Sequence, residues 1–497
     1  MGKILDPKNL FFKIINLKKK NPKLKVGLCH GVFDIIHEGH IKHFEYSKNK
    51  CDILVVSLTS DQFVNKGPGR PYNDEIKRSN ILASIKYIDY VFINYNATPL
   101  NFIKHLKPNF YFKGKDYLKT DLTGNLAKES KEIKKFKGRL IITPTEIMSS
   151  TKIYNNLFSK FDNYQKITIQ NIKSNFHYDL IEKIINIASK TELTLIGDTI
   201  IDEYKFCDVI GLASKDPCFS TVENRIKKIQ GGALAVAIMA SQFVKKVNFF
   251  TYGEDDILKK YLKKYRNINL INLNTKLSIQ KKTRYLNSNR FEKILQVTNY
   301  KKLKLTEHSA RLMKSKMQKF KLKNNIIVCD FGVGLFEHDF LDWINTIKDK
   351  YLNVQTNSLN YGYNTVKKYF KARYVSLDER EWRLALQDQE DSLLLKLKKL
   401  KNYHYKNLTR GKNGSIFIDR SNKIIKSPVF FNKTIDTTGC GDAYFILSSI
   451  LLINKCPIEL IPFLSNIYAG IHSQSLGNEK VIPKNEYLRV VKGILNI

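Results

Sequence analysis

The sequence predicts a two-domain α/β protein, and three observations predict it. A chain of 497 residues is too long for one ordinary hydrophobic core and fits two or three domains. Hydrophobic residues make up 43% of the chain, with only 12 prolines and 24 glycines, so it can bury real cores. Apolar strand-like runs alternate with helical patterns, which indicates parallel sheets covered by helices on both faces.

The first region reads as alternating strands and helices. We expect a helix over Leu10 to Lys19, a strand at Lys25 to Leu28, and a turn that leads into a helix through Tyr46. The alternation continues with a strand at Ile53 to Leu58, a helix from about Asp74 to Ile85, strands near Tyr90 to Ile93, Phe110 to Phe112 and Ile141 to Ile142, and a helix from about Ser149.

A second α/β region follows. Residues 158–190 are polar, helical in character and without a motif, so we expect a linker there. A strand at Leu193 to Ile196 then opens about 300 further residues. Their glycine clusters, at 231–232, 330–334, 409–414 and 437–442, are expected at strand ends, where open α/β sheets bind ligands. The apolar run Phe445 to Ile453 is too short to cross a membrane and predicts a buried helix.

The charge of the chain is strongly basic. Lys and Arg total 84 against 46 Asp and Glu, a formal net charge of +38. Only 14 of the basic residues are Arg, and the 70 Lys are spread along the chain. A nucleic-acid binder more often concentrates Arg and aromatic residues on one surface, so we expect small anionic substrates and no nucleic-acid partner.

The cysteines and the first residues of the chain indicate the cellular compartment of the protein. Seven cysteines are an odd number without a C-x-x-C pair, which favours neither a disulfide framework nor a zinc site. The opening MGKILDPKNLFFKIINLKKK lacks the apolar core and cleavage site of a signal peptide. We therefore expect a cytoplasmic protein with no membrane span.

A first candidate site lies at His37-Glu38-Gly39-His40, between an expected strand and an expected helix. The free N–H groups of a helix N-terminus bind phosphate, and glycine allows a nucleotide close to the backbone. Two histidines there can donate hydrogen bonds to a triphosphate as charge moves to the leaving pyrophosphate. Two structural or metal-binding histidines are the alternative interpretation.

The surroundings of this pair resemble a known family. GVFDIIHEGH together with SSTKI is similar to the HxGH nucleotidyltransferase superfamily, from about residue 25 to 157. The resemblance implies a Rossmann-like, cytidylyltransferase-like fold, a substrate phosphate that attacks the α-phosphorus of a nucleoside triphosphate, Mg²⁺, and catalysis by His37 and His40. It assigns nucleotide binding to Gly31, Phe33, Gly39, Lys48, Arg78, Ser150 and Thr151, and substrate binding to Lys113 and Asp116. Ser149 to Thr151 could also form a plain helix N-cap.

A second candidate site is the segment Asp436 to Ala443, DTTGCGDA, before an apolar helix. Consecutive N–H groups at 439–442 can form an anion-binding nest at the helix N-terminus. A carboxylate beside an anion makes chemical sense as a general base for a hydroxyl that attacks it, as in a kinase. An N-cap aspartate with glycine turns is the alternative.

DTTGCGD resembles the DTxGAGD signature of ribokinase-like (PfkB) carbohydrate kinases, and the resemblance covers about residues 191–497. It implies that Asp442 takes the proton of a sugar hydroxyl and that Gly439, Cys440 and Gly441 form the anion hole. By the other family motifs, Thr409, Gly411 and Gly414 bind the nucleotide, Asp198, Asp202, Gly231, Gly232, Lys282 and Arg284 bind the sugar, and Asp378 and Glu381 hold Mg²⁺ indirectly.

Three residues depart from that family's motifs. Ala235 stands where GGAxNVA has asparagine, Asp378 where N-x-x-E has asparagine, and Cys440 where GAGD has alanine. Asp378 keeps an oxygen ligand for a magnesium–water network. Ala235 removes an amide from the expected sugar pocket, so the reaction type is better defined than the sugar.

The pair of domains resembles the bifunctional heptose kinase/nucleotidyltransferases, in inverted order. We expect a transferase domain at 1–157, a linker at 158–190 and a kinase domain at 191–497. The resemblance implies phosphorylation of D-glycero-D-manno-heptose 7-phosphate at O1, a separate phosphatase, and AMP transfer from ATP to heptose 1-phosphate, giving ADP-heptose for lipopolysaccharide or another surface glycan. A homo-oligomer is expected. The alternatives are a CTP-dependent enzyme acting on another sugar or polyol phosphate, and a catalytically silent basic binding protein.

Overall fold

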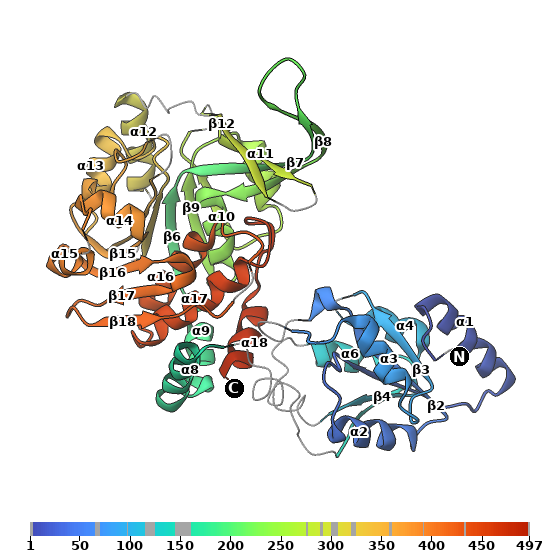
Figure 1. The fold of residues 1–497 in the computed structure, drawn as a ribbon. Coiled ribbons are helices and arrows are strands. Elements are labelled where there is room, and N and C mark those ends of the chain that lie inside the picture. Colours follow the sequence, from blue (N-terminus) through green and yellow to red (C-terminus); the bar gives the residue numbers. More distant parts are fainter. Residues whose placement is uncertain are drawn as a thin grey trace. The chain divides into compact units, whose positions relative to one another are not determined.

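The structure is a computed structural model that describes residues 3–64, 70–96, 98–114, 125–144, 161–274, 277–288, 292–299, 307–319, 325–356, 360–390, 392–431 and 434–495. The chain forms two compact units (Figure 1). One contains Met1–Asp162 and Leu488–Ile497, and the other contains Asn163–Tyr487.

The first unit is a five-stranded parallel sheet in the order β3-β2-β1-β4-β5. Its strands are β1 (Val26–Gly31), β2 (Ile53–Thr59), β3 (Tyr90–Asn94), β4 (Phe110–Lys113) and β5 (Arg139–Ile142). Its helices are α1 (Pro7–Lys20), α2 (Glu38–Lys48), the 3₁₀ turn η1 (Asp61–Phe63), α3 (Glu75–Ala83), α4 (Leu100–Leu106) and α6 (Asn125–Lys134).

Alternate residues of these strands enter two cores, because successive side chains of a strand point to opposite faces. On one face Val26 and Leu28 pack in a cluster with α1, α4 and α6. On the other face Cys29 packs in a cluster with Phe44 of α2 and Leu82 of α3. The predicted parallel sheet with helices on both faces is confirmed.

The second unit is built on a nine-stranded sheet in the order β10-β9-β6-β13-β14-β15-β16-β17-β18. The bounds are β6 (Glu192–Gly197), β9 (Lys246–Thr251), β10 (Ile268–Asn272), β13 (Ile326–Asp330), β14 (Lys350–Val354), β15 (Ala372–Asp378), β16 (Tyr403–Thr409), β17 (Ser415–Ile418) and β18 (Ile424–Ser427). The strands are parallel except at the edge, where β17 and β18 run antiparallel to their neighbours. The sequence did not predict this antiparallel edge.

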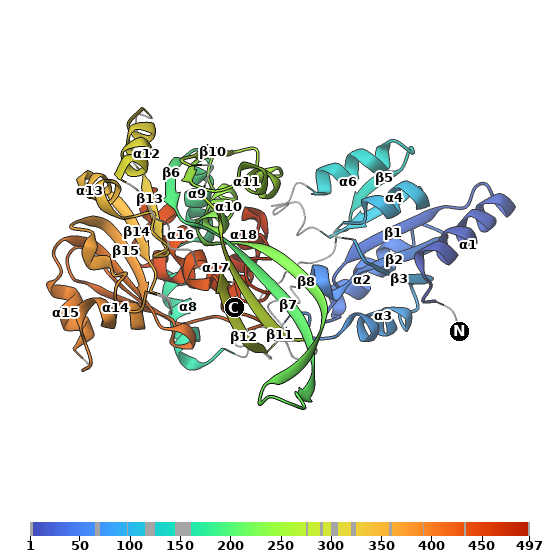
Figure 2. The ribbon, with the colours of Figure 1, turned by 90° about the horizontal axis from the view of Figure 1, so that it is seen from above.

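Helices cover both faces of the nine-stranded sheet (Figures 1 and 2). α12 (Glu307–Lys319), α13 (His338–Thr346), α14 (Glu379–Leu386) and α15 (Leu393–Lys399) share one core with the sheet. α10 (Gly232–Ser241), α16 (Cys440–Ile453) and α17 (Leu460–His472) pack on the other face. α16 is buried from Asp442 to Leu452, which confirms the predicted buried helix. The unit also contains α11 (Asp255–Leu262), η2 (Val366–Lys368), η3 (Gly411–Asn413) and the first turn of α18 (Lys484–Leu495).

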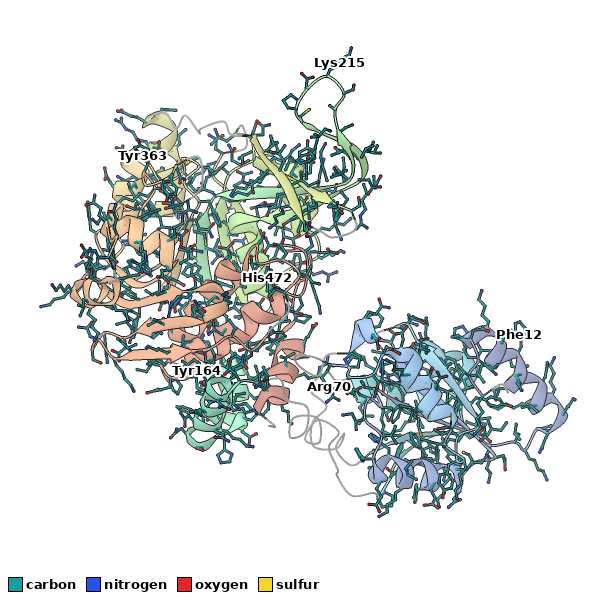
Figure 3. All side chains as sticks on the ribbon, viewed as in Figure 1. Phe12, Arg70, Tyr164, Lys215, Tyr363 and His472 are labelled. Atoms are coloured by element: carbon teal, nitrogen blue, oxygen red, sulfur yellow. The ribbon has the colours of Figure 1, made fainter. Side chains whose placement is uncertain are left out.

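A second, four-stranded sheet has the order β12-β11-β7-β8. Its strands are β7 (Thr199–Leu212), β8 (Phe219–Gly231), β11 (Gln280–Asn287) and β12 (Lys293–Asn299). β7 and β8 form a long hairpin whose end extends beyond β11, with Lys215 at its tip (Figure 3). The sequence did not predict this sheet, because the strand predicted at Leu193 to Ile196 corresponds to β6 alone and β7 begins just after it.

Residues 158–190, predicted as a linker, contain α8 (Asn163–Asn175) and α9 (Tyr178–Ala188). α9 buries four apolar residues, and Lys484 donates to both Asn186 and Ser189 near its end. Both helices therefore belong to the second unit. In the described part of the chain, no helix is both long enough and apolar enough to cross a membrane.

Candidate active sites

The first site lies where the strand order in the sheet of the first unit reverses, between β1 and β4. Strand order runs outward from β1 through β2 on one side and through β4 on the other, so the carboxyl ends of β1 and β4 border the crevice where such sheets bind ligands. His37 is the extended N-cap of α2, and its ring centroid lies 3.9 Å from that of His40. The ring of Phe33 meets His40 edge-on at 5.5 Å. The structure thus brings the predicted histidine pair together at a helix N-terminus.

The ends of β4 and β1 add Lys113 and the neutral His30, and α2 adds the neutral His43. Lys113, at the end of β4, is buried, and its Nζ lies 3.4 Å from the carbonyl oxygen of His30 at the end of β1. Burial and then the charge of Lys113 lower the pKa of His30 far below its ordinary value and that of His43 to about 4. His43 Nδ1 lies 2.9 Å from Thr143 Oγ1. Lys113 places a positive charge at the end of β4, offset in part by its ion pair with the buried Glu129 (Nζ to Oε2 3.8 Å), while these histidines stay uncharged at neutral pH.

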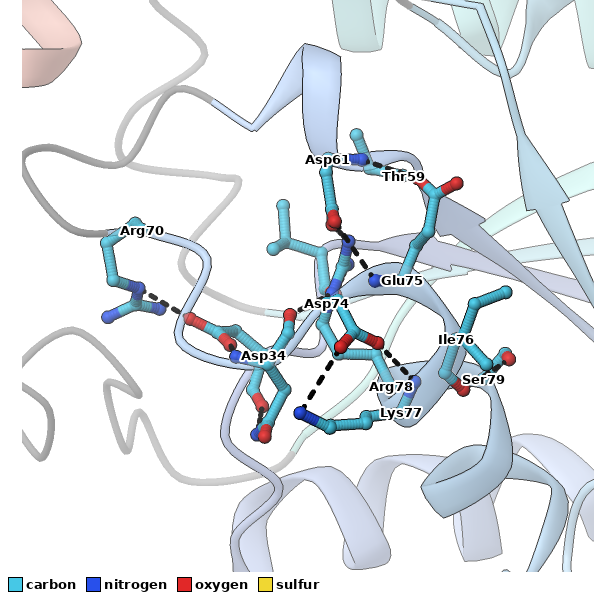
Figure 4. Close-up of polar contacts among 12 residues, drawn as sticks. Asp34, Thr59, Asp61, Arg70, Asp74, Glu75, Ile76, Lys77, Arg78 and Ser79 are labelled. Carbon is cyan, nitrogen blue, oxygen red and sulfur yellow. Dashed lines mark hydrogen bonds and ion pairs between the residues drawn. The ribbon is translucent and has the colours of Figure 1, made fainter.

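Arg78 supports the loop that precedes the histidines (Figure 4). Its guanidinium is fully buried and donates to the carbonyl oxygens of Val32, at 2.6 Å, and Asn73, at 3.0 Å, and it forms an ion pair with Asp61. These contacts give Arg78 a positioning role. Direct contact with a nucleotide, which the resemblance implied, remains a prediction.

Asp34 fixes the same loop from its other end (Figure 4). Its carboxylate accepts hydrogen bonds from the N–H groups of Tyr72 and Asn73 at 2.9 Å and forms a buried ion pair with Arg70, with Nε and Oδ2 2.6 Å apart. Phe33, next to Asp34, has a positive φ of 47°. This unusual backbone needs the surrounding contacts, which join residues 32–34 to residues 70–78.

The other predicted transferase residues differ in their distance from the histidine pair. Lys48 lies at the opposite end of α2, about 12 Å from His40 along the helix axis. Its Nζ forms an ion pair with Asp89 at 2.7 Å. The structure does not bring Lys48 to the histidines. Gly31 ends β1, and Gly39 opens α2. Asp116, Ser150 and Thr151 lie outside the described residues.

The second site centres on Asp442 at the start of α16. Its Oδ1 accepts hydrogen bonds from Asn353 Nδ2 at 2.9 Å and Gln355 Nε2 at 2.7 Å. Burial raises the pKa of Asp442 to about 7, while nearby Lys282 opposes that rise. The carboxyl can therefore lose or take up a proton near neutral pH, as a general base requires.

The glycine loop before Asp442 has the geometry of an anion site. Gly439, the N-cap of α16, has φ +82°, and a Cβ there would lie 2.4 Å from Asn478 Oδ1, so only glycine fits. A Cβ on Gly441 would meet open space. The N–H of Cys440 donates to Thr437, and that of Ala443 to Gly439. Within the described part of the chain, the N–H groups of Gly441 and Asp442 remain available to an anion.

Two further features steady this loop. The Cys440 thiol lies 3.6 Å from the Ala469 carbonyl oxygen, and burial raises its pKa to about 12, so cysteine at this position is a neutral, inward-facing group. Asp436 Oδ1 accepts from the N–H and hydroxyl of Thr438 and from Lys293 Nζ, at 2.8–3.0 Å. Against the effect of burial, these contacts hold the pKa of Asp436 below its ordinary value.

Asp442 faces a cavity of about 100 Å³ between the two sheets of the second unit. Asp202 on β7 and Arg284 on β11 line it and are joined by a 2.6 Å ion pair. Lys282, two residues before Arg284 on the same strand face, also lines it. Gly232 forms part of the wall, and Gly231 lies against Asp202, where a Cβ would come within 2.4 Å of the carboxylate.

Asp198 and Ala235 lie away from this cavity's lining. Asp198 Oδ2 accepts from the Phe331 N–H, and burial followed by repulsion from Asp330 raises the pKa of Asp198 to about 8. Asp198 thus supports Phe331, which does line the cavity, and direct contact of Asp198 with a sugar remains a prediction. Ala235 is buried inside α10, so this residue does not shape the pocket described here.

The predicted nucleotide and magnesium residues lie at neighbouring strand ends. Thr409 ends β16, and Gly411 and Gly414, with φ values of +50° and +79°, form the turn that follows. Asp378 ends β15 and forms a capping box with Glu381, whose pKa is raised to about 8 by burial and then by Asp378. Mg²⁺ fits this pair, because a divalent cation relieves the repulsion and both carboxylates keep free lone pairs.

Sequence reasoning missed four residues of the second site: Asn353, Gln355, His472 and Asn478. His472 (labelled in Figure 3) is buried beneath Gly439, and burial lowers its pKa to about 4. Asn353 and Gln355 alternate with apolar residues at the end of a fully buried strand. Two polar residues two positions apart in such a strand share one face. This pattern could have indicated Asn353 and Gln355 as site residues from the sequence. Asn478 and His472 carry no comparable pattern.

Comparison with known proteins gives a match over the region that contains the first site. Residues 28–156 match a family model described as cytidylyltransferase-like. Relatives named bifunctional protein HldE include one from Campylobacter jejuni (strain RM1221), 43% identical over 107 residues, which are 21% of this chain and 23% of that protein. Another, from Geobacter metallireducens, is 36% identical over 151 residues, 30% of each chain. The matched part thus spans about a quarter of the length of these relatives.

Solved structures also resemble this chain. A ribokinase from Thermotoga maritima has 14% identity and a TM-score of 0.44, covering 60% of this chain and 99% of its own. Phosphofructokinase-2 from Escherichia coli has 11% identity and a TM-score of 0.49, covering 61% and 99%.

Proposed function

We propose that this chain is a bifunctional enzyme of sugar-nucleotide synthesis, with a nucleotidyltransferase in residues 1–157 and a carbohydrate kinase in residues 191–497. The observation that carries the proposal is the position of Asp442. Asp442 has a pKa of about 7, and it lies at an anion-binding helix N-terminus beside a cavity lined by Lys282 and Arg284. A binding protein has no need of a base beside an anion site, which argues against a catalytically silent role.

In the kinase step, Asp442 takes the proton of a sugar hydroxyl, and the hydroxyl oxygen forms a bond to the γ-phosphorus of ATP as the bond to ADP breaks. The N–H groups of Gly441 and Asp442 stabilise charge on the transferred phosphoryl group. Lys282 and Arg284 bind the phosphate that the sugar already carries. Mg²⁺ at Asp378 and Glu381, bound through water, would neutralise phosphate charge.

In the transferase step, a sugar 1-phosphate oxygen attacks the α-phosphorus of a nucleoside triphosphate and pyrophosphate leaves. His37 and His40 donate hydrogen bonds to the triphosphate at the N-terminus of α2. Lys113 adds positive charge from the end of β4. The family model over residues 28–156 supports this assignment.

The substrates that fit best are D-glycero-D-manno-heptose 7-phosphate for the kinase, with phosphorylation at O1, and heptose 1-phosphate with ATP for the transferase. The enzyme acts in the cytoplasm and its product is ADP-heptose for surface glycans. A separate phosphatase removes the 7-phosphate between the two steps. The names of the relatives and the pairing of two sites support this choice. A homo-oligomer is part of the proposal.

³¹P NMR of the full-length protein tests both activities. With Mg-ATP and heptose 7-phosphate we expect the 1,7-bisphosphate, and with heptose 1-phosphate and ATP we expect ADP-heptose and pyrophosphate. Asp442→Asn should abolish only the first reaction, and His40→Ala only the second. If neither substrate reacts while other sugar phosphates do, the heptose assignment is wrong. If no sugar phosphate reacts at all, the enzymatic proposal is wrong.

CTP is the second nucleotide to test, because the matching family model is described as cytidylyltransferase-like. A preference for CTP would keep the reaction and change the product to a CDP-activated sugar or polyol. Competition between equimolar ATP and CTP in the same NMR assay decides between them.

A further inference from the structure

We propose that Asn353 and Gln355 form an amide clamp that positions the carboxylate of Asp442, holding its Oδ1 and leaving its Oδ2 to the substrate hydroxyl. The inference rests on the proposed kinase function and adds two positioning residues to it. Neither residue belongs to a motif that the sequence analysis singled out.

The geometry of the clamp is specific. Asn353 Nδ2 lies 2.9 Å and Gln355 Nε2 lies 2.7 Å from the same oxygen, Asp442 Oδ1. Two donors use both lone pairs of that oxygen, so the carboxylate cannot rotate without losing them. Among the described residues, none donates to Oδ2. The clamp thus makes the two oxygens of one carboxylate unequal.

The backbone that carries the two amides is itself held. Asn353 lies inside β14, opposite Cys329 of β13, and is buried. The Gln355 N–H donates to Asp330 at 2.8 Å, and its carbonyl oxygen accepts from Asn364 at 3.0 Å. With both backbone groups engaged, the position from which the Gln355 side chain reaches Asp442 is fixed before substrate binds.

The electrostatic surroundings explain why Asp442 needs such donors. Burial and the carboxylate of Asp202 both favour its protonated form. The two amides and Lys282 favour the ionised form, which is the form that can take a proton. Cys329, Glu381 and Cys440 also interact electrostatically with Asp442, and Arg284 lines the same cavity. None of these four donates a hydrogen bond to Asp442 within the described part of the chain, so the amides are its direct donors.

The test replaces each amide by an apolar side chain of similar shape, Asn353→Leu and Gln355→Met. Asn407→Leu is the matched control, because Asn407 is a buried asparagine of the nearby strand β16 that donates to Ser376 and does not contact Asp442. Two quantities are measured: the pH dependence of kinase kcat/KM, and the pKa of Asp442 in the full-length protein labelled with ¹³C at aspartate Cγ. The Asp442→Asn spectrum identifies the signal.

Loss of one amide should raise the pKa of Asp442 by about one unit, as expected for a hydrogen bond to a charged group. In the kinase assay this lowers kcat/KM about tenfold at pH 6 and leaves the rate above pH 9 within about twofold, while Asn407→Leu keeps the wild-type profile. An unchanged Asp442 pKa in both clamp variants would overturn the inference. The carbon titration needs no turnover, so it decides the clamp even if the proposed kinase function fails.

Discussion

The Nη1 atom of Arg78 donates a hydrogen bond to the carbonyl oxygen of Val32 at 2.6 Å, across 46 positions of the chain. Val32 belongs to the loop between β1 and the histidine pair. An arginine on α3 thus fixes the backbone that sets the direction of His37 and His40. The guanidinium is fully buried and also binds Asn73 and Asp61. Its contribution to the stability of the fold can therefore be measured apart from any contact with substrate.

We expect Arg78→Met to lower the free energy of unfolding of the first unit by about 3 kcal/mol, because it leaves a carboxylate and two carbonyl groups without their donor. Transferase kcat should fall with it. Denaturant unfolding of the variant and the wild type measures the first effect. Unchanged stability with only a raised KM for the nucleotide would mean that Arg78 contacts the nucleotide directly.

Lys48 should contribute little to nucleotidyl transfer. It lies at the far end of α2 from the histidines, and its ion pair with Asp89 is partly exposed. Lys48→Ala should keep transferase activity within about twofold and cost less than about 1 kcal/mol of stability. His40→Ala, measured beside it, should lose about a hundredfold or more in kcat. A comparable loss in both variants contradicts this assignment.

Gly439 and Gly441 should respond differently to alanine. At Gly439 the φ of +82° and the contact with Asn478 make alanine strained, so Gly439→Ala should lower both Tm and kinase activity. At Gly441 a methyl group enters open space, so Tm should stay within about 2 °C while the methyl occupies the anion position and activity falls at least tenfold. Thermal unfolding and a kinase assay of both variants separate the two effects.

The kinase should lose activity in acid with an apparent pKa of about 7. Burial raises the pKa of Asp442 to that value, and only the ionised carboxylate can take the proton of the hydroxyl. kcat/KM should therefore rise about tenfold per pH unit below pH 7 and level off above it. Initial rates from pH 5 to 9 with saturating Mg-ATP test this. A flat profile would exclude Asp442 as the base.

The first unit should become less stable as the pH falls from about 6.5 to about 4. In the second unit the raised pKa values of Asp198, Glu381 and Asp442 act in the opposite direction, so there we expect only the contribution of His472 to fall. Burial lowers the pKa of His43 in the first unit, and of His472 in the second, to about 4. Below pH 6.5 the unfolded chain binds protons that the folded chain excludes, so each histidine can cost up to about 3 kcal/mol by pH 4. His43→Gln should flatten the pH dependence of the first unit, and His472→Gln should remove the contribution of His472 from that of the second unit, both measured by denaturant unfolding at several pH values.

Local pattern predicted much of the fold. The helix at the start, the five strands, α2 and α3 of the first unit lie within a few residues of their expected positions, because each has a clear apolar period. The sequence did not predict α4 and α6, and the helix expected from Ser149 lies outside the described residues. The four-stranded sheet was missed. Its strands belong to a separate sheet only through long-range pairing of β7 with β8 and β11, which no local window contains.

The sequence by itself determined the residues whose chemistry is local: the histidine pair at a helix N-terminus, and the glycine loop that ends in Asp442. Their spacing within a single turn fixes their proximity. Only the tertiary structure decided which distant residues join them. Asn353 and Gln355 reach Asp442 across nearly 90 positions, and Arg78 reaches Val32 across 46, because strands and helices packed on one sheet bring their ends together regardless of distance along the chain.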